Sequence, residues 1–364
     1  MNNIITYTRD NLNTFDSLPF NSVDSLILSS AAYFRFPESI PEIINWKGIR
    51  LLELYRAEYF QEMFRNVPLT GSARQLFYAM AASPRFRNIR IMGYTEQFDL
   101  QTEKQFSAVT FQLQPNLYYI AYRGTDSTLI GWKEDFNMAF QSPIPSQEEA
   151  VRYMEKAALY CPGKLLTGGH SKGGNLAVYA SAMCRENVQY RIQQIFSHDG
   201  PGFLENTLQS NEFQKIAGRI FKTIPQSSVV GMLLENQEDF QIVRSNSTGL
   251  LQHDQYTWEI ENYAFIYIKT LTKDAAYTDK ILTDWLKQIS PDDRERFVDA
   301  LFSVLNANQM HTLNDLRTDW QAAIPASLHA AAHLDNDTKK FLLHALTKLA
   351  AMGIKNMLPS NIVK

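Results

Sequence analysis

Apolar and polar positions in the first part of the chain recur with a helical period. Between Trp46 and Phe64, apolar side chains lie three and four positions apart, which predicts one helix over that stretch. A helix is also predicted over 71–82, and a run of apolar and small residues begins at Asp24. We therefore expect the first hundred residues to be mostly helical.

The pattern changes to alternation near Ile89. Alternating positions predict strands over 89–94 and 106–113, and a turn at 114–116 predicts a hairpin whose second strand covers 117–122. Farther along, strands and helices follow each other: strands over 164–168, 192–197, 219–224 and 240–243, and helices over 148–160, 175–184 and 212–217. This alternation is typical of a largely parallel sheet with helices on both faces.

The composition shifts after Trp258. Long helices are predicted over 275–289, 291–308, 313–323 and 337–352. The sequence thus predicts a mixed α/β domain over 1–265, which includes the N-terminal helical segment, and a C-terminal helical region over 266–364.

Composition and charge exclude several classes of protein. With 45% apolar and 20% charged residues among 364, the chain has ordinary globular usage rather than that of a disordered or fibrous protein. Its net charge of −3 gives no reason to expect a nucleic-acid partner. Cys161 and Cys184 are too few for a disulfide scaffold and wrongly spaced for zinc. The first residues lack a signal-peptide pattern, and no run of about 18 apolar residues occurs, so we expect a cytoplasmic protein without a transmembrane segment.

The most specific motif is Gly169-His170-Ser171-Lys172-Gly173, a G-x-S-x-G sequence. A predicted strand precedes it and an Ala-rich helix follows it, which is the setting of a nucleophile elbow. Glycine is expected on both sides of Ser171 because side chains there would clash with the neighbouring strand and helix. We therefore predict Ser171 as the nucleophile, the alternative being an ordinary glycine-rich turn.

A nucleophilic serine needs a base, and histidine is the usual one. Of the seven histidines, His253 follows the last predicted strand, where the base of this arrangement is expected. His170 lies inside the motif, where its side chain should point away from the serine. We predict His253 as the base, the alternative being a histidine on a surface loop.

The acid is harder to assign, because the segment after the strand over 219–224 contains no carboxylate before Glu235. Asp199 follows the preceding strand and lies at the same edge of the predicted sheet. We predict that its carboxylate lies about 2.6–3.2 Å from a ring nitrogen of His253, whose other nitrogen faces Ser171. Glu235 and Asp239 remain as substitutes, and a turn-forming role for Asp199 is the alternative.

An oxyanion hole needs two amides that point at the developing negative charge. The residue after the nucleophile, Lys172, is predicted to supply one. The loop after the strand over 117–122 is predicted to supply the other through Thr125, which also carries a hydroxyl.

These segments together resemble a known family. Tyr122-Arg123-Gly124-Thr125-Asp126, Trp132, Asp135 and the motif at 169–174 resemble the class 3 lipase branch of the α/β-hydrolases. With 228–232 and Gln252-His253-Asp254, the chain over roughly 20–260 resembles the bacterial Mbeg1-like family, formerly classed as a domain of unknown function. The resemblance implies an α/β-hydrolase fold with esterase or lipase chemistry.

The resemblance also bears on single residues. In class 3 lipases the residue matching Thr125 forms the oxyanion hole. Their acid follows the strand matching 219–224, where this chain has Ser227 or Ser228 instead. The run from Asp199 to Phe203 is similar to the pancreatic-type lipases, whose acid follows the earlier strand, and this similarity supports Asp199.

The sequence therefore predicts a serine hydrolase of carboxylic esters that uses Ser171, His253 and Asp199 and forms an acyl-enzyme. A small-molecule ester or a lipid is the expected substrate, and no metal or cofactor is expected. His329 and His333, four positions apart, are an alternative metal pair. The alternative function is a catalytically inactive α/β-hydrolase scaffold for binding or regulation, which the missing late acid favours.

Overall fold

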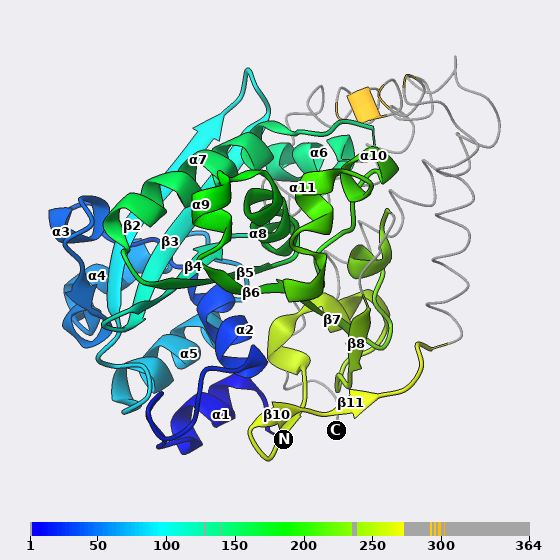
Figure 1. Cartoon of the computed structure of the whole chain (residues 1–364). Coiled ribbons are helices and arrows are strands. Elements are labelled where there is room, and N and C mark those ends of the chain that lie inside the picture. The colour runs from blue at the N-terminus through cyan, green and yellow to red at the C-terminus, as the bar shows by residue number, and fades with distance from the viewer. Residues whose placement is uncertain are drawn as a thin grey trace.

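The computed structural model describes residues 2–126, 129–138, 140–234 and 239–272, together with Asp292, Glu295, Val298, Asp299 and Phe302 (Figure 1). Its main feature is a sheet with the strand order β1-β2-β3-β4-β5-β6-β7-β8-β11. The strands span Ile49–Arg50, Arg90–Asp99, Lys104–Gln114, Leu117–Tyr122, Lys164–His170, Ile192–His198, Ile220–Pro225, Phe240–Val243 and Tyr267–Ile268, in that order. β9 (Ile260–Glu261) and β10 (Ala264–Phe265) form a separate two-stranded ribbon.

The sheet is antiparallel at its two ends and parallel in its centre. β2, β3 and β4 form an antiparallel meander, and β3 and β4 are the predicted hairpin. β4 to β8 pair in parallel, and β11 closes the sheet antiparallel to β8. Since β11 extends to Ile268, the sheet continues beyond residue 265, and the division of the chain there stays a prediction.

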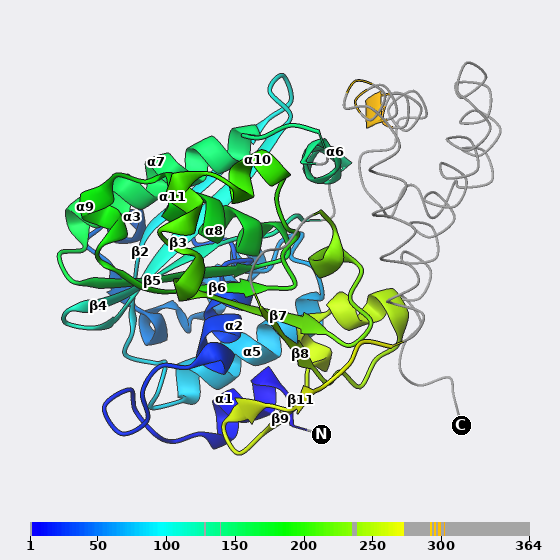
Figure 2. The same cartoon turned by 45° about the vertical axis from the view of Figure 1, so that its right-hand side comes forward.

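One face of the sheet is covered by α7 (Pro145–Tyr160), α8 (Lys172–Met183) and α11 (Asn211–Gln214), as Figures 1 and 2 show. α9 (Glu186–Gln189) and α10 (Glu205–Leu208) lie on the same side. α8 is rich in alanine and glycine, and every residue from Lys172 to Ala182 is buried, so the helix packs closely on the strands. Cys161 and Cys184 are free thiols buried in this layer.

The opposite face is covered by α1 (Ile4–Asp10), α2 (Ser22–Ala31) and α5 (Thr70–Ala82). α2 lies directly against the sheet, and all its residues from Val23 to Ala31 are buried. Its two inward hydroxyls, Ser25 and Ser29, both bond the Tyr119 hydroxyl of β4, at 2.8 and 2.9 Å. A helix without a polar face is stable here because its polar side chains find partners inside the protein.

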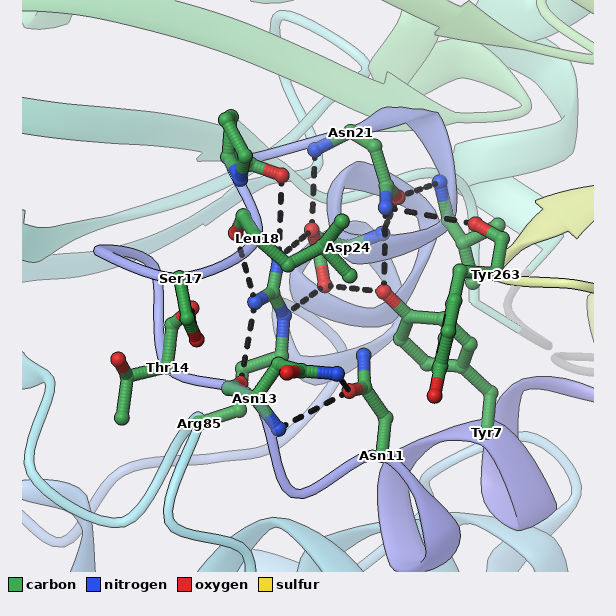
Figure 3. A network of polar contacts seen from close by, with 12 residues as sticks. Tyr7, Asn11, Asn13, Thr14, Ser17, Leu18, Asn21, Asp24, Arg85 and Tyr263 are labelled. Atoms are coloured by element: carbon green, nitrogen blue, oxygen red, sulfur yellow. Dashed lines mark hydrogen bonds and ion pairs between the residues drawn. The ribbon is translucent and has the colours of Figure 1, made fainter.

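A buried ion pair joins the helices of this layer (Figure 3). Arg85 donates to both carboxylate oxygens of Asp24, at 2.7 and 2.5 Å, and neither side chain is exposed. The remaining guanidinium protons go to the carbonyls of Asn13, Leu18 and Pro19, and Tyr7 donates to Asp24. The network thus ties the segment after α5 to α1, α2 and the loop between them.

The prediction of one helix from Trp46 to Phe64 is wrong. The stretch contains β1, a 3-10 turn at Leu51–Leu54 and the short α4 (Ala57–Met63), after α3 at Pro41–Ile44. The helix is interrupted because Gly48 has a φ of +70° and β1 pairs with β2 instead. α1 and α6 (Leu129–Asn137) were also not predicted from the sequence.

The remaining central elements lie within a few residues of their predicted positions. A sheet that is parallel from β4 to β8, lies between two helical layers and has a strand-turn-helix at its centre is the α/β-hydrolase fold, so the predicted fold class is confirmed. The helices predicted beyond residue 272 lie outside the described residues.

Candidate active site

The backbone turns sharply where β5 passes into α8. Ser171 lies between them with φ 58° and ψ −135°, a conformation that L-residues rarely adopt. A Cβ on Gly169 would clash with the backbone of Gly173, and one on Gly173 would clash with the carbonyl oxygen of Tyr122 in β4. The predicted reason for glycine on both sides of Ser171 is therefore confirmed.

The structure brings Asp199 and His253 together at this edge of the sheet. Asp199 follows β6 with a φ of 52° and is fully buried. Its Oδ2 lies 2.6 Å from His253 Nδ1, within the predicted range. His253 ends the 3-10 turn Gly249–His253, and its side chain is 22% exposed. A buried carboxylate therefore orients a histidine that solvent and small molecules can reach.

The other carboxylate oxygen of Asp199 is also engaged. Ser228 Oγ donates to Oδ1 at 2.5 Å, and the Gly231 amide donates to the same oxygen at 3.1 Å. Ser228 occupies the segment after β7 that holds no carboxylate. The Ser228 hydroxyl, which follows β7, thus supports the carboxylate of Asp199, which follows β6.

The other acids considered are Asp239, Glu235 and Asp254, the neighbour of His253. Asp239 is exposed, and Glu235 lies outside the described residues. Asp254 accepts a hydrogen bond from the amide of Tyr256 at 2.8 Å and so caps the next turn. Burial raises the pKa of Asp254 to about 6.

Ser171 is buried, with 8% of its surface exposed. Within the described part of the chain, no hydrogen bond joins its hydroxyl to His253. The predicted approach of the second ring nitrogen to Ser171 therefore stays a prediction.

His170 has a contact that the sequence analysis did not foresee. Its Nε2 lies 2.8 Å from the backbone carbonyl oxygen of His253, and the two ring centroids are 4.5 Å apart. The only sequence signal for this contact is the place of His170 beside Ser171.

The predicted oxyanion residues lie over a buried cluster of charges. Thr125 Oγ1 donates to Asp135 Oδ2 at 2.6 Å, so its hydroxyl is engaged. Lys172 Nζ is fully buried, 2.8 Å from Glu134 and 3.5 Å from Asp135, and both carboxylates belong to α6. Within the described residues we find no hydrogen bond from the backbone amides of Thr125 and Lys172. The use of these amides by an oxyanion stays a prediction.

Burial and charge oppose each other in this cluster. Burial favours the neutral form of Lys172, but the neighbouring Glu134 and Asp135 carboxylates raise its pKa, so the ammonium stays charged. Burial raises the pKa of Asp135 to about 6, against the effect of Lys172. One cation thus holds two carboxylates beneath the turn.

His198 has no free ring nitrogen. It ends β6, one residue before Asp199, and its nitrogens bond Thr223 Oγ1 at 2.7 Å and Ser25 Oγ at 2.8 Å. Burial lowers its pKa to about 3, so the ring is neutral near pH 7. Its partners give it a structural role in the sheet.

The described residues include no group of three or more His, Cys, Asp or Glu side chains that could hold a metal ion. The predicted pair His329 and His333 lies outside the described residues. No helix in the same part of the chain is both long and apolar enough to cross a membrane.

The chain is similar to several known proteins. Solved structures similar to the chain include a fungal lipase in complex with an inhibitor (14% identity over 61% of this chain and 77% of that one, TM-score 0.37). The Rhizomucor miehei lipase propeptide complex (14% identity, 58% and 70%, TM-score 0.35) and lipase II from Rhizopus niveus (15% identity, 63% and 86%, TM-score 0.34) are also similar. No protein with a curated description matches. The family model described as Mbeg1-like matches residues 80–303, more than half of the chain, and the protein therefore belongs to the Mbeg1-like family.

Proposed function

We propose that the protein is a serine hydrolase of carboxylic esters, with Ser171 as nucleophile, His253 as base and Asp199 as acid. The observation that carries the proposal is the 2.6 Å contact between the buried Asp199 carboxylate and His253, at the sheet edge where the strained turn presents Ser171. A surface histidine without a role would not need a buried carboxylate that two further donors hold in place.

The reaction follows from these positions. Asp199 Oδ2 accepts a hydrogen bond from His253 Nδ1–H. The proton of the ring is thereby held on Nδ1, and Nε2 is unprotonated and able to take the proton of the Ser171 hydroxyl. The serine oxygen attacks the ester carbonyl, and the amides of Thr125 and Lys172 donate to the oxyanion. His253 then gives its proton to the leaving alcohol, and water releases the acyl group by the same steps.

The Asp135 carboxylate acts here through Thr125. Asp135 accepts a hydrogen bond from the Thr125 hydroxyl. This bond fixes the Thr125 side chain and so the loop that carries the Thr125 amide. Lys172 keeps that carboxylate compensated, since its ammonium lies 3.5 Å away. The same residue therefore contributes an amide to the hole and a charge beneath it.

The substrate is a small-molecule ester or a lipid. The inactive scaffold was favoured by the lack of a carboxylate after β7, and the 2.6 Å contact between Asp199 and His253 supports a carboxylate after β6 as the acid instead. Thioesters and amides use the same groups, so a panel of acyl esters, thioesters and anilides is the way to rank substrates.

A fluorophosphonate probe tests the proposal directly, because it reacts with activated serines. Ser171→Ala should abolish labelling and reduce ester hydrolysis by roughly 10⁴-fold or more, while circular dichroism shows an intact fold. Ser210→Ala, which removes only the hydroxyl that caps α11, is the matched control and should be labelled as the wild type is. Undiminished labelling of Ser171→Ala would refute the assignment. A wild type that is neither labelled nor active would favour the inactive scaffold.

A further inference from the structure

His170 lies between the two loops that carry the proposed catalytic groups. It is 4% exposed, and its ring contacts His253 on one side and Tyr33 on the other. Its Nε2 lies 2.8 Å from the carbonyl oxygen of His253, and its Nδ1 lies 3.3 Å from the Tyr33 hydroxyl. Both ring nitrogens therefore have a partner.

The chemistry of these partners determines where the proton of His170 lies. A carbonyl oxygen only accepts, so Nε2 carries the hydrogen and donates it to His253. Burial lowers the pKa of His170 well below its usual value, and the nearby His253 lowers it further, so the ring is neutral and Nδ1 is an acceptor. The Tyr33 hydroxyl is then the donor to Nδ1.

Tyr33 extends this line of contacts to the loop of Thr125. The Tyr33 hydroxyl oxygen lies against Gly124, the residue before Thr125. A Cβ on Gly124 would clash with that oxygen, so only glycine allows the approach. Tyr33 is buried two residues after the end of α2.

We propose that His170, with Tyr33, is a positioning residue that ties the backbone of His253 to the turn at Ser171 and to the loop of Thr125. The inference rests on the proposed function. Gly124 precedes Thr125, His170 precedes Ser171, and the backbone of His253 is bonded directly. Hydrogen bonds and the close contact of Tyr33 with Gly124 therefore connect these three positions. The Asp199 contact fixes the ring of His253, and the His170 contact fixes its main chain.

The tautomer can be measured without any activity. In ¹⁵N-labelled wild-type protein, the imidazole spectrum should show His170 with its proton on Nε2 and remain unchanged between about pH 5.5 and 8. The signal is assigned by its loss in His170→Gln. A proton on Nδ1, or titration of His170 in this range, would overturn the proposal even if the protein proves to be inactive.

Three substitutions separate the two links of His170. The amide nitrogen of His170→Gln lies near the position of Nε2 and keeps the donor to His253. His170→Asn places its amide near Nδ1 and keeps only the Tyr33 link, whereas His170→Phe keeps neither. We expect kcat to stay within about threefold of wild type for Gln and to fall roughly ten- to a hundredfold for Asn and Phe, with KM little changed.

Tyr33→Phe has a matched control on the opposite face of the sheet. Tyr153→Phe removes another buried hydroxyl, which bonds Thr110 at 2.9 Å. Similar losses of stability are expected from the two variants, but only Tyr33→Phe should lower kcat. If the wild type is active and all folded variants have the same kcat, the hydrolase proposal stands and the positioning role of His170 is refuted. If the wild type is inactive but His170 carries its proton on Nε2, only the hydrolase proposal is refuted.

Discussion

The Asp199 carboxylate has hydrogen-bond donors on both oxygens, and they come from different parts of the chain. His253 bonds Oδ2, and Ser228 and Gly231 bond Oδ1. Because burying a carboxylate without partners is costly, these donors compensate for the burial of Asp199 beside His253. Ser228 therefore supports the Asp199 carboxylate.

The proximity of these two side chains predicts that the acid can be moved. Asp199→Ser alone should lower kcat by roughly 10³- to 10⁴-fold, because His253 loses its orienting carboxylate. Combining it with Ser228→Asp exchanges the two side chains, and we expect at least about tenfold recovery over the single variant in an ester assay. A double variant as inactive as Asp199→Ser would show that Ser228 lies too far from His253 to take over.

His198 predicts a pH effect on stability. Above its unfolded pKa of 6.5 the ring is neutral in both states and contributes nothing. Below it the unfolded chain takes up a proton that the folded ring, with a pKa of about 3, does not, so the free energy of unfolding falls as the pH falls. Asp135 and Asp254, with pKa values raised to about 6, act in the opposite direction and make the wild-type slope a mixture.

A comparison with His198→Gln isolates the histidine, since both proteins keep the two aspartates. Relative to wild type, the variant should gain on the order of 2 kcal/mol of stability between pH 7 and pH 5. Urea unfolding at the two pH values measures this difference. If the gap between the two proteins is the same at both, His198 does not titrate as the structure requires.

Among the elements, α6 shows most clearly what a hydrophobic pattern omits. Glu134 and Asp135 look like solvent-exposed charges in the sequence, and the helix was not predicted. In the structure Glu134 is fully buried and accepts from Lys172, from the Ser146 hydroxyl and from backbone amides. Pairing of charges over a distance of 38 residues cannot be read from local periodicity.

The strands and helices of the central sheet were predictable because their apolar residues repeat at the period of the element. Ser171, Asp199 and His253 could be proposed because the glycine motif marks the turn and the strand ends lie at one edge. The approach of His170 to His253 and the donor role of Ser228 could not, since neither follows from sequence spacing. The break at Gly48 was hidden because the apolar residues around it kept a helical spacing.

The link between α6 and α8 predicts a large loss of stability when one charge is removed. Glu134→Gln should lower the free energy of unfolding by about 3–5 kcal/mol, because it leaves the buried Lys172 ammonium with reduced compensation. The exposed pair of Arg50 and Glu53 supplies the control, and Glu53→Gln should cost about 1 kcal/mol or less. Equal losses in urea titrations would argue against the buried pair.

At the scale of the whole molecule, the sheet separates two hydrophobic cores. One lies between the sheet and α1, α2 and α5, and the other between the sheet and α7 and α8. The buried Arg85–Asp24 pair belongs to the first side and joins segments that are 61 residues apart. The N-terminal segment is thus part of the folded domain rather than an appendage to it.

Arg85→Met tests how strongly that side depends on its ion pair. Removing the guanidinium leaves the Asp24 carboxylate buried beside Tyr7 and Asn21 alone, and we expect a loss of about 3–5 kcal/mol in thermal or urea unfolding. Asp24→Asn should cost a similar amount. The double variant should cost less than the sum of the two, and strict additivity would contradict a direct pair.

The two buried cysteines can report how often the hydrophobic core between the sheet and α7 and α8 opens. Burial raises the pKa of Cys161 and of Cys184 to about 12, so the native thiols are neither ionised nor accessible to an alkylating reagent. Iodoacetamide therefore modifies the wild-type chain only while the α7–α8 layer is open, and the modification rate counts those openings. The two cysteines thus report on one side of the sheet without any substitution. The rate of their modification in Arg85→Met shows whether destabilising the opposite side also increases opening of the α7–α8 layer.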